Sequence, residues 1–428
     1  MLKIQQNRQK PSKCLLFSQK NTMFRRFFIP PHEENPMTAL AGLKVLDFSG
    51  LLPAPFGTRI LADMGATVLR VEAPARPDMV RVLPPFDSQG LSACHGSLNR
   101  NKGSIVIDLK TPEGVAIIKE LVKDYDIVVE QFRPSVMSRL GLGYEDLRLI
   151  NPRLIYCAVT GYGQQGVYKN RAGHDLNYLA IAGILDYTGR QETGPLPLPI
   201  QAADITGGLY AATGILAAVI HRQQTGQGQF IDISLTDAAF SLQALTAPPA
   251  LMANHQPKPE TDTLNGGTFY DCYRTADHRY LSIAGLEPQF FMAFAQAIHR
   301  PDLIPLAIRH DLTTVTLVKT AISEAISTKT LHEWQDIFAS IEACVEPVLS
   351  FAEACEHPQI SARKMIVDVP TPNGDTQKQI ASPVVFSATP SQYLISGGQL
   401  GANTQEVLLA HGFSDEQIKE WSKKGIII

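Results

Sequence analysis

A histidine and an aspartate, His174 and Asp204, are the two residues of this chain whose types would together perform acid–base chemistry. His174 follows a glycine in the run AGHDLNY at 172–178, and Asp204 stands just ahead of a Gly-Gly pair and a long apolar stretch. Reversible removal of a proton next to a carbonyl group requires a base that takes the proton and an acid that returns it. An imidazole and a carboxylate on separate elements would supply these groups from opposite sides of one substrate carbon.

Both residues also have an ordinary structural interpretation. A histidine in a loop often serves only as a hydrogen-bonding group. Asp204 stands where the N-cap of a helix starting at Ile205 is expected, and a helix N-terminus favours the ionised carboxylate. Because capping and acid–base roles are compatible, the sequence leaves both interpretations open.

Composition and charge narrow the class of protein. The chain has 428 residues, 44% of them hydrophobic, and a formal net charge of −3. Seven Lys/Arg and two acids give residues 1–36 a charge of +5, which leaves −8 for the rest and argues against a nucleic-acid partner. The six cysteines form no Cys-x-x-Cys pair, which indicates reduced thiols in a cytoplasmic protein rather than disulfides or a metal cluster.

Residues 1–36 lack periodicity and are acid-free up to Glu33, which resembles an organelle presequence more than a secretory signal. We interpret them as a disordered or non-native extension, with Met37 as the working start. The longest apolar helical stretch, 209–220, is shorter than a membrane span, so no membrane segment is expected.

Alternating strand and helix patterns predict an α/β fold with a large doubly wound, Rossmann-like parallel sheet. We expect a large domain over 37–246, a linker over 247–267, a smaller α+β domain over 268–356 and a return segment over 357–428 that completes the large domain. The expected elements of the large domain are strands at 43–48, 67–72, 104–108, 127–130 and 154–160 and helices at 56–64, 112–123 and 134–140.

One motif in this region resembles a dinucleotide fingerprint. Residues 161–166 (GYGQQG) match G-x-G-x-x-G after a strand, but no helix opens after Gly166 and several strand–helix units precede the motif. A glycine turn that shapes a ligand pocket is the favoured interpretation, and neither a redox cofactor nor a metal site is expected.

Eight ordered motifs, taken together, resemble the family III CoA-transferase superfamily from about Leu40 to the C-terminus. They are GLKVLD at 42–47, LADMGA at 61–66, NRNK at 99–102, IDLK at 107–110, FRP at 132–134, RLGLG at 139–143, TGYGQ at 160–164 and TGQGQ at 225–229. The run GHDLNY at 173–178 is similar to the alpha-methylacyl-CoA racemase branch, whereas many transferases carry an aromatic residue where His174 stands.

The resemblance implies a racemase that interconverts (R)- and (S)-2-methylacyl-CoA thioesters in lipid metabolism. His174 and Asp204 would be the two acid/bases around an enolate, and Glu287 would orient His174. Glu287 also fits a helix-start acid before a proline. The alternative is a family III CoA-transferase that moves CoA between an acyl-CoA and a free acid, with Asp204 as nucleophile. A non-catalytic acyl-CoA binding protein is the third hypothesis.

The resemblance also implies an interlocked homodimer and a binding site for CoA, which is part of the substrate rather than a separate cofactor. Lys110, Arg133 and Arg139 suit phosphate groups, although surface charge is their alternative explanation. Glu72 ends the second strand, where an acid suits a ribose hydroxyl. Racemases often carry a basic residue directly after this acid, whereas this chain has Ala73, and Arg76 would take the place of the basic residue. The full expected set is Glu72, Ile107, Asp108, Leu109, Lys110, Gln131, Phe132, Arg133, Arg139, Gly173, Asp175, Leu176, Asn177 and Tyr178.

Overall fold

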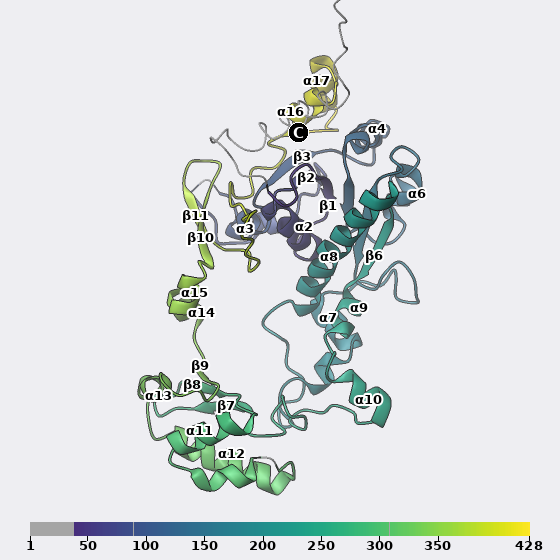
Figure 1. Ribbon diagram of the computed structural model, residues 1–428. Coiled ribbons are helices and arrows are strands. Elements are labelled where there is room, and N and C mark those ends of the chain that lie inside the picture. The colour runs from purple at the N-terminus through teal and green to yellow at the C-terminus, as the bar shows by residue number, and fades with distance from the viewer. Residues whose placement is uncertain (1–37, 89, 308) are drawn as a thin grey trace, which may run out of the picture. The chain divides into compact units, whose positions relative to one another are not determined.

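The computed structural model describes residues 38–428 apart from 89 and 308, so the extension predicted at 1–36 lies outside the described residues. Figure 1 labels its helices and strands. The described chain divides into a large unit, made of the residues up to Tyr178 with Gln201–Ala239 and Lys364–Ile428, and a small unit, made of Leu179–Ile200 and Phe240–Arg363. The sequence assigned 179–200 to the large domain and began the return segment at 357.

The large unit is built on a six-stranded sheet whose strands all run parallel, in the order β3-β2-β1-β4-β5-β6. This confirms the predicted doubly wound α/β fold. The strands are β1 (Lys44–Phe48), β2 (Thr67–Glu72), β3 (Lys102–Val106), β4 (Ile127–Glu130), β5 (Ile155–Thr160) and β6 (Phe230–Ser234). The strand order reverses between β1 and β4, and such sheets bind ligands in the crevice at the carboxyl ends flanking that point.

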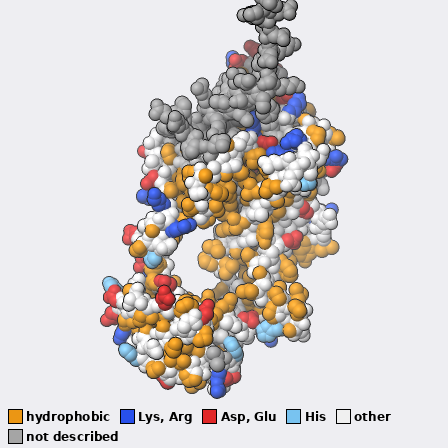
Figure 2. Space-filling model, in the orientation of Figure 1, with side chains coloured by type: hydrophobic (Ala, Val, Ile, Leu, Met, Phe, Trp, Pro, Cys, Tyr) orange, Lys and Arg blue, Asp and Glu red, His pale blue; other side chains and the backbone are white. Residues whose placement is uncertain are grey.

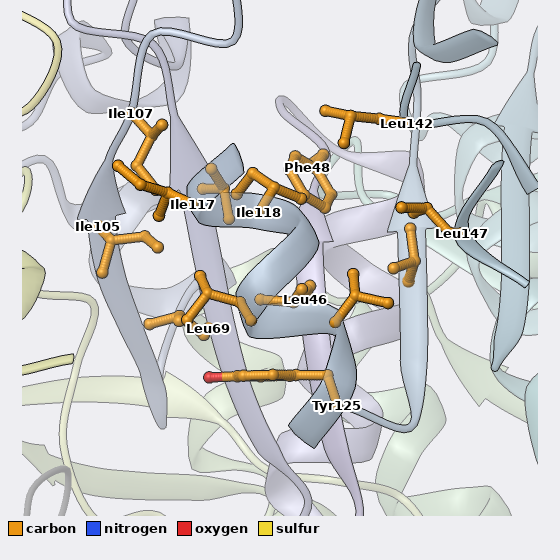
Figure 3. Packing of buried hydrophobic residues seen from close by; sticks show 14 of the residues in the cluster. Leu46, Phe48, Leu69, Ile105, Ile107, Ile117, Ile118, Tyr125, Leu142 and Leu147 are labelled. Atoms are coloured by element: carbon orange, nitrogen blue, oxygen red, sulfur yellow. The ribbon is translucent and has the colours of Figure 1, made fainter. Parts of the chain in front are cut away.

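One face of the sheet carries the main apolar core, shown in Figure 3. Leu46, Leu69 and Ile105 from adjacent strands are fully buried there, together with Ile117 and Ile118 of α4 (Pro112–Leu121). Strands buried on both faces need continuous apolar runs, which is why the Val/Ile-rich segments of the sequence predicted them correctly.

Two helices, α2 (Pro53–Asp63) and α8 (Ala202–Thr225), pack against each other with their glycines in contact. An added Cβ on Gly57 would lie 2.6 Å from the carbonyl oxygen of Gly208, and one on Gly208 would lie 2.4 Å from that of Pro53. α2 begins three residues before the predicted start at 56, because a proline is well suited to the first helical position.

By length and composition α8 could cross a membrane, contrary to the prediction that no segment is long enough. Its most apolar window has a mean hydropathy of 1.5, and 44% of that window is buried. The helix packs on α2, β5 and β6 within the large unit, as the core helix of a globular domain does.

The large unit has several further short elements. They are α3 (Ala93–Leu98), α5 (Val136–Arg139), α6 (Tyr144–Leu147), α16 (Thr404–Ala410) and α17 (Asp415–Lys423), the short helices η1 (Met79–Val82) and η2 (Val122–Asp124), and the hairpin of β10 (Ile366–Pro370) with β11 (Thr376–Ile380). Helices α7 (Asp175–Ile181) and α9 (Leu235–Ser241) each continue into the small unit.

The small unit has its own core around an antiparallel sheet, β7-β8-β9. Its first two strands form an antiparallel hairpin, and the predicted linker contains helix α10 (Ala247–Ala253). The elements are η3 (Ile184–Tyr187), β7 (Asp271–Arg274), β8 (Tyr280–Ile283), α11 (Pro288–Ala297), η4 (Pro301–Leu306), α12 (Leu312–Ile326), α13 (Leu331–Phe338), β9 (Val345–Pro347), α14 (Phe351–Glu356) and α15 (Pro358–Ala362).

The glycine contact between α2 and α8 makes a prediction about stability. Gly208→Ala places its methyl group against backbone atoms, so we expect the free energy of unfolding to fall by about 1–3 kcal/mol in urea denaturation. Gly214→Ala on the same helix is the control, because its methyl meets only the side chain of Ile231 at 3.3 Å. Equal stability of the two variants would contradict the close packing.

Candidate active site

His174 lies immediately before α7, and its backbone closes the first turn of that helix. Its carbonyl accepts the N–H of Asn177 at 2.8 Å and that of Tyr178 at 3.3 Å, while its own N–H donates to the side-chain oxygen of Asn177 at 3.0 Å. The side chain is exposed, and among residues 38–428 (without 89 and 308) no hydrogen bond reaches its imidazole. The ring is therefore available to a ligand.

Tyr178 anchors the loop that carries His174. Its hydroxyl donates to the carbonyl of Gly173 at 2.6 Å, and its ring meets that of Tyr162 edge-on at 5.3 Å. A Cβ on Gly161 or Gly173 would lie 2.6 or 2.8 Å from Tyr178. The first glycine of the G-x-G-x-x-G run therefore makes room for this tyrosine, and the next helix, α7, starts only at Asp175.

Asp204 lies in the first turn of α8 and is not its N-cap, so the predicted capping role was wrong. The helix begins at Ala202, with Gln201 at the N-cap position and no side-chain cap there. The carboxylate of Asp175 instead accepts the N–H of Asp204 at 3.0 Å. This bond joins the segment of His174 directly to the helix of Asp204.

The carboxyl group of Asp204 has an unusual protonation equilibrium. Burial, with the nearby charge of Asp175, raises the pKa of Asp204 from 3.8 to about 7. The expectation that the helix N-terminus keeps this carboxylate ionised was therefore wrong, because desolvation and a like charge outweigh the helix end. Burial and the charge of Asp204 also raise the pKa of Tyr178 to about 12, which keeps that hydroxyl protonated.

The expected CoA contacts on two loops follow the carboxyl ends of β3, the outermost strand of the sheet, and of β4, which flanks the point where the strand order reverses. Ile107 and Asp108 follow β3, and Gln131 and Phe132 follow β4. Gln131 accepts the N–H of Ala54 at 3.1 Å and so fixes the start of α2 beside β4. Ile107 is fully buried and pairs with Ile427, so it lines the sheet rather than the surface.

Three cations expected to bind phosphate are exposed near this edge: Lys110 after β3, Arg133 after β4, and Arg139 in α5. Within the described part of the chain none of them takes part in an ion pair. Unpaired cations beside the carboxyl ends of parallel strands suit a phosphate-bearing ligand.

Glu72 has its carboxylate occupied by protein groups. Arg81 contacts both oxygens, at 2.5–3.2 Å, and Arg70 lies 3.5 Å away. Burial alone would raise the pKa of Glu72, but the hydrogen bonds and charges of the two arginines outweigh it and lower the pKa to about 2. Glu72 is 6% exposed, so the ribose contact expected at this strand end requires another group.

The remaining predicted residues divide between the two units. Asp175, Leu176 and Asn177 lie in the first turn of α7 with Leu176 and Asn177 exposed, and Leu109 is half-buried after β3. Glu287 belongs to the small unit, where it is exposed at the N-cap position of α11 and accepts backbone N–H groups through its carbonyl. Its role beside His174 stays a prediction.

Sequence reasoning missed Glu130, a buried acid at the carboxyl end of β4. Burial, with the charge of Asp232, raises the pKa of Glu130 to about 7, although its carboxylate accepts the N–H of Phe132 at 2.7 Å. The available signal was an acid that ends an otherwise apolar strand, next to a loop already expected to bind the ligand.

The described residues contain no group of three or more His, Cys, Asp or Glu that would hold a metal ion. The fold is that of an α/β protein with a parallel doubly wound sheet, and ligands of such sheets bind at the carboxyl edge, near which the described chain has three exposed cations without ion pairs.

Comparison with known proteins places the chain in a family. The model of CoA-transferase family III matches residues 40–404. Alpha-methylacyl-CoA racemase of Homo sapiens is 34% identical over 393 residues, which cover 91% of this chain and 97% of the relative. Succinate–glutarate CoA-transferase of Agrobacterium fabrum is 33% identical over 391 residues, which cover 87% and 96%.

A solved structure agrees with this assignment. The CAIB/BAIF family protein from Brucella suis has a TM-score of 0.77 and 28% identity, and the match covers 87% of this chain and 99% of that one. The chain belongs to CoA-transferase family III, a family whose relatives named here include both racemases and CoA-transferases.

The raised pKa of Asp204 makes the stability of the protein depend on pH. The folded state holds this proton more tightly than the unfolded chain, so the stabilisation is present below about pH 4 and is lost as pH rises through about 7. Asp204→Asn removes the titrating group. We therefore expect this variant to gain stability relative to the wild type between pH 4 and pH 8 in urea denaturation.

The control uses Asp175→Asn, which keeps an oxygen for the N–H of Asp204 but removes the neighbouring charge. In that background the effect of Asp204→Asn should be smaller. A difference between wild type and Asp204→Asn that stays constant from pH 4 to pH 8 would contradict the raised pKa.

Proposed function

We propose that this chain is a 2-methylacyl-CoA racemase. The observation that carries the proposal is the hydrogen bond from the N–H of Asp204 to Asp175, which joins the helix of a carboxyl group with a pKa of about 7 to the segment that carries the exposed imidazole of His174. Near neutral pH both protonation states of Asp204 are populated, which suits a group that takes a proton in one direction and returns it in the other.

The reaction needs one proton removed from C2 and one delivered to its opposite face. His174 takes the C2 proton, the C2–H electron pair moves into a thioester enolate, and protonated Asp204 donates to the other face. The second epimer uses the same groups with their roles reversed. Backbone N–H groups at the start of α8 would stabilise the enolate oxygen, apart from the N–H of Asp204, which donates to Asp175.

CoA is held as part of the substrate, and no separate cofactor or metal is required for this chemistry. Lys110, Arg133 and Arg139 are the proposed phosphate contacts, because they are exposed cations without ion-pair partners in the described chain. On the face shown in Figure 2, acidic and basic side chains are interspersed.

The proposal includes an interlocked homodimer in the cytoplasm, acting in lipid metabolism. Within such a dimer Glu287 would orient the imidazole of His174. Apolar side chains exposed in the small unit, among them Leu251 at 80% and Met252 at 89%, are consistent with burial by a second copy.

The alternative is CoA transfer with Asp204 as nucleophile, which relatives such as the succinate–glutarate CoA-transferase favour. A carboxyl group with a pKa of about 7 is half protonated at neutral pH, and only its ionised form attacks a thioester. Racemisation uses both forms, so the site supports it better.

Solvent exchange at C2 distinguishes the two activities. In heavy water, without any carboxylic acid co-substrate, we expect the wild type to incorporate deuterium at C2 of a 2-methylacyl-CoA, measured by mass spectrometry. His174→Ala and Asp204→Asn should each lower racemisation by about 10²–10⁴-fold, because each removes one of the two acid/bases.

Other outcomes of this experiment would support the alternative functions. No deuterium uptake by the wild type, together with an acyl group on Asp204 that hydroxylamine releases, would establish the transferase. Neither C2 exchange nor CoA transfer by the wild type, with acyl-CoA still bound, would support a binding protein instead. Lys123→Ala serves as the control. This exposed lysine of η2 pairs with Glu120 at the C-terminal end of α4, away from the candidate site.

A further inference from the structure

An ion-pair cluster in the small unit is centred on Asp271, the first residue of β7. Arg190 binds its carboxylate in a bidentate manner, with Nη2 2.6 Å from Oδ1 and Nη1 3.0 Å from Oδ2. Lys319 of α12 adds a third contact, 2.6 Å from Oδ2, and Nη1 of Arg190 also contacts Glu260 at 3.2 Å. The Asp271 side chain at the centre of the cluster is 11% exposed, whereas that of Arg190 is 44% exposed.

Arg190 belongs to a tight turn that is itself well ordered by hydrogen bonds. Its carbonyl accepts the N–H of Gly194 at 2.9 Å, and the N–H of Gln191 donates to Glu260 at 3.0 Å. Gly189 has a positive φ of 82°, and a Cβ there would lie 2.3 Å from the carbonyl oxygen of Gly194. The turn therefore presents the guanidinium of Arg190 from a fixed backbone.

The cluster joins segments that are far apart in the sequence. It ties the turn at 189–194 to the linker through Glu260, to the sheet of the small unit through Asp271, and to α12 through Lys319. An isolated surface ion pair contributes little to stability, but a bidentate arginine in a network of four charges is the exception. Burial would raise the pKa of Asp271, yet its hydrogen bonds to Arg190 and Lys319 lower it, which agrees with a strong pairing.

The turn that carries Arg190 lies in the stretch of chain that connects the segment of His174 to the segment of Asp204. The chain leaves the large unit after Tyr178, just beyond His174, and re-enters it at Gln201, just before Asp204. We call the intervening stretch, 179–200, the excursion. The excursion is held near its start at Ala182, whose carbonyl accepts a hydrogen bond from the side chain of Gln243 at 2.8 Å. The ion pairs of Arg190 hold its middle.

We propose that Arg190 is a positioning residue that restrains the excursion and thereby the two segments that carry His174 and Asp204. This inference rests on the proposed function. Without the ion pairs the excursion loses the restraint in its middle and keeps mainly the bond of Gln243 near its start, so the ends of α7 and α8 attached to it gain conformational freedom. Catalysis by two groups around one carbon is sensitive to such freedom, because small displacements of a reacting group cost much of the rate.

The expected result is a fall in kcat with little change in KM. In the C2 deuterium-exchange reaction, Arg190→Ala should lower kcat by roughly tenfold, while KM for the acyl-CoA stays within about twofold, since the proposed phosphate contacts lie on other loops. Arg190→Lys should recover part of the rate, because a lysine keeps one ion pair but loses the bidentate geometry.

Arg279→Ala is the matched control. Arg279 also lies in the small unit, binds Glu353 in a bidentate manner at 2.9 and 3.0 Å, and is similarly exposed, but it makes no contact with the excursion. We expect its kcat to equal that of the wild type. An unchanged kcat in Arg190→Ala, or an equal loss in Arg279→Ala, would overturn the positioning role.

Backbone hydrogen exchange separates this inference from the proposed function. Arg190→Ala should speed amide exchange in the excursion, in α7 and in the first turn of α8, whereas Arg279→Ala should not. If the wild type catalyses no C2 exchange, the proposed function fails, and amide exchange alone decides the restraint. Unchanged protection of α7 and α8 in Arg190→Ala would then reject it.

Discussion

The hydrogen bond from the N–H of Asp204 to the carboxylate of Asp175 is the interaction on which the candidate site depends. A helix begins with N–H groups that lack partners, and here the partner comes from the residue that follows His174. One bond therefore orders the start of α8 and joins it to the residue next to His174. The same carboxylate places a negative charge beside Asp204, so the geometry of the site and its proton affinity have a common origin.

The surrounding fold holds this bond in place from two sides. Gly57 and Gly208 let α2 and α8 approach until backbone meets backbone, and Gln131 fixes the start of α2 to the end of β4. The carboxyl edge of the parallel sheet, the exposed cations and the start of α8 are thereby built on one rigid unit. The loop of His174 is the exception, since it relies on Tyr178 and, in our proposal, on the restraint of the excursion at Arg190.

The parts of this molecule that could be predicted from sequence are those set by local patterns. Buried apolar runs predicted the parallel strands, and family-like motifs located His174 and Asp204. The start of α8 could not be placed, because Ala202 and Ala203 carry no capping signal and the cap comes from Asp175. The pKa values of Asp204 and Glu130 depend on burial by distant segments, and the link of Arg190 to Asp271 joins residues that no local pattern connects.

Direct titration of the Asp204 carboxyl group tests the account most directly. The side-chain ¹³C resonance of Asp204, assigned by its loss in Asp204→Asn, should titrate with a midpoint near 7 in the ligand-free protein, because burial and Asp175 oppose ionisation. A midpoint near the ordinary value of 3.8 would mean that this carboxyl group is fully ionised at neutral pH, and the site would then lack the acid that the proposed racemisation requires.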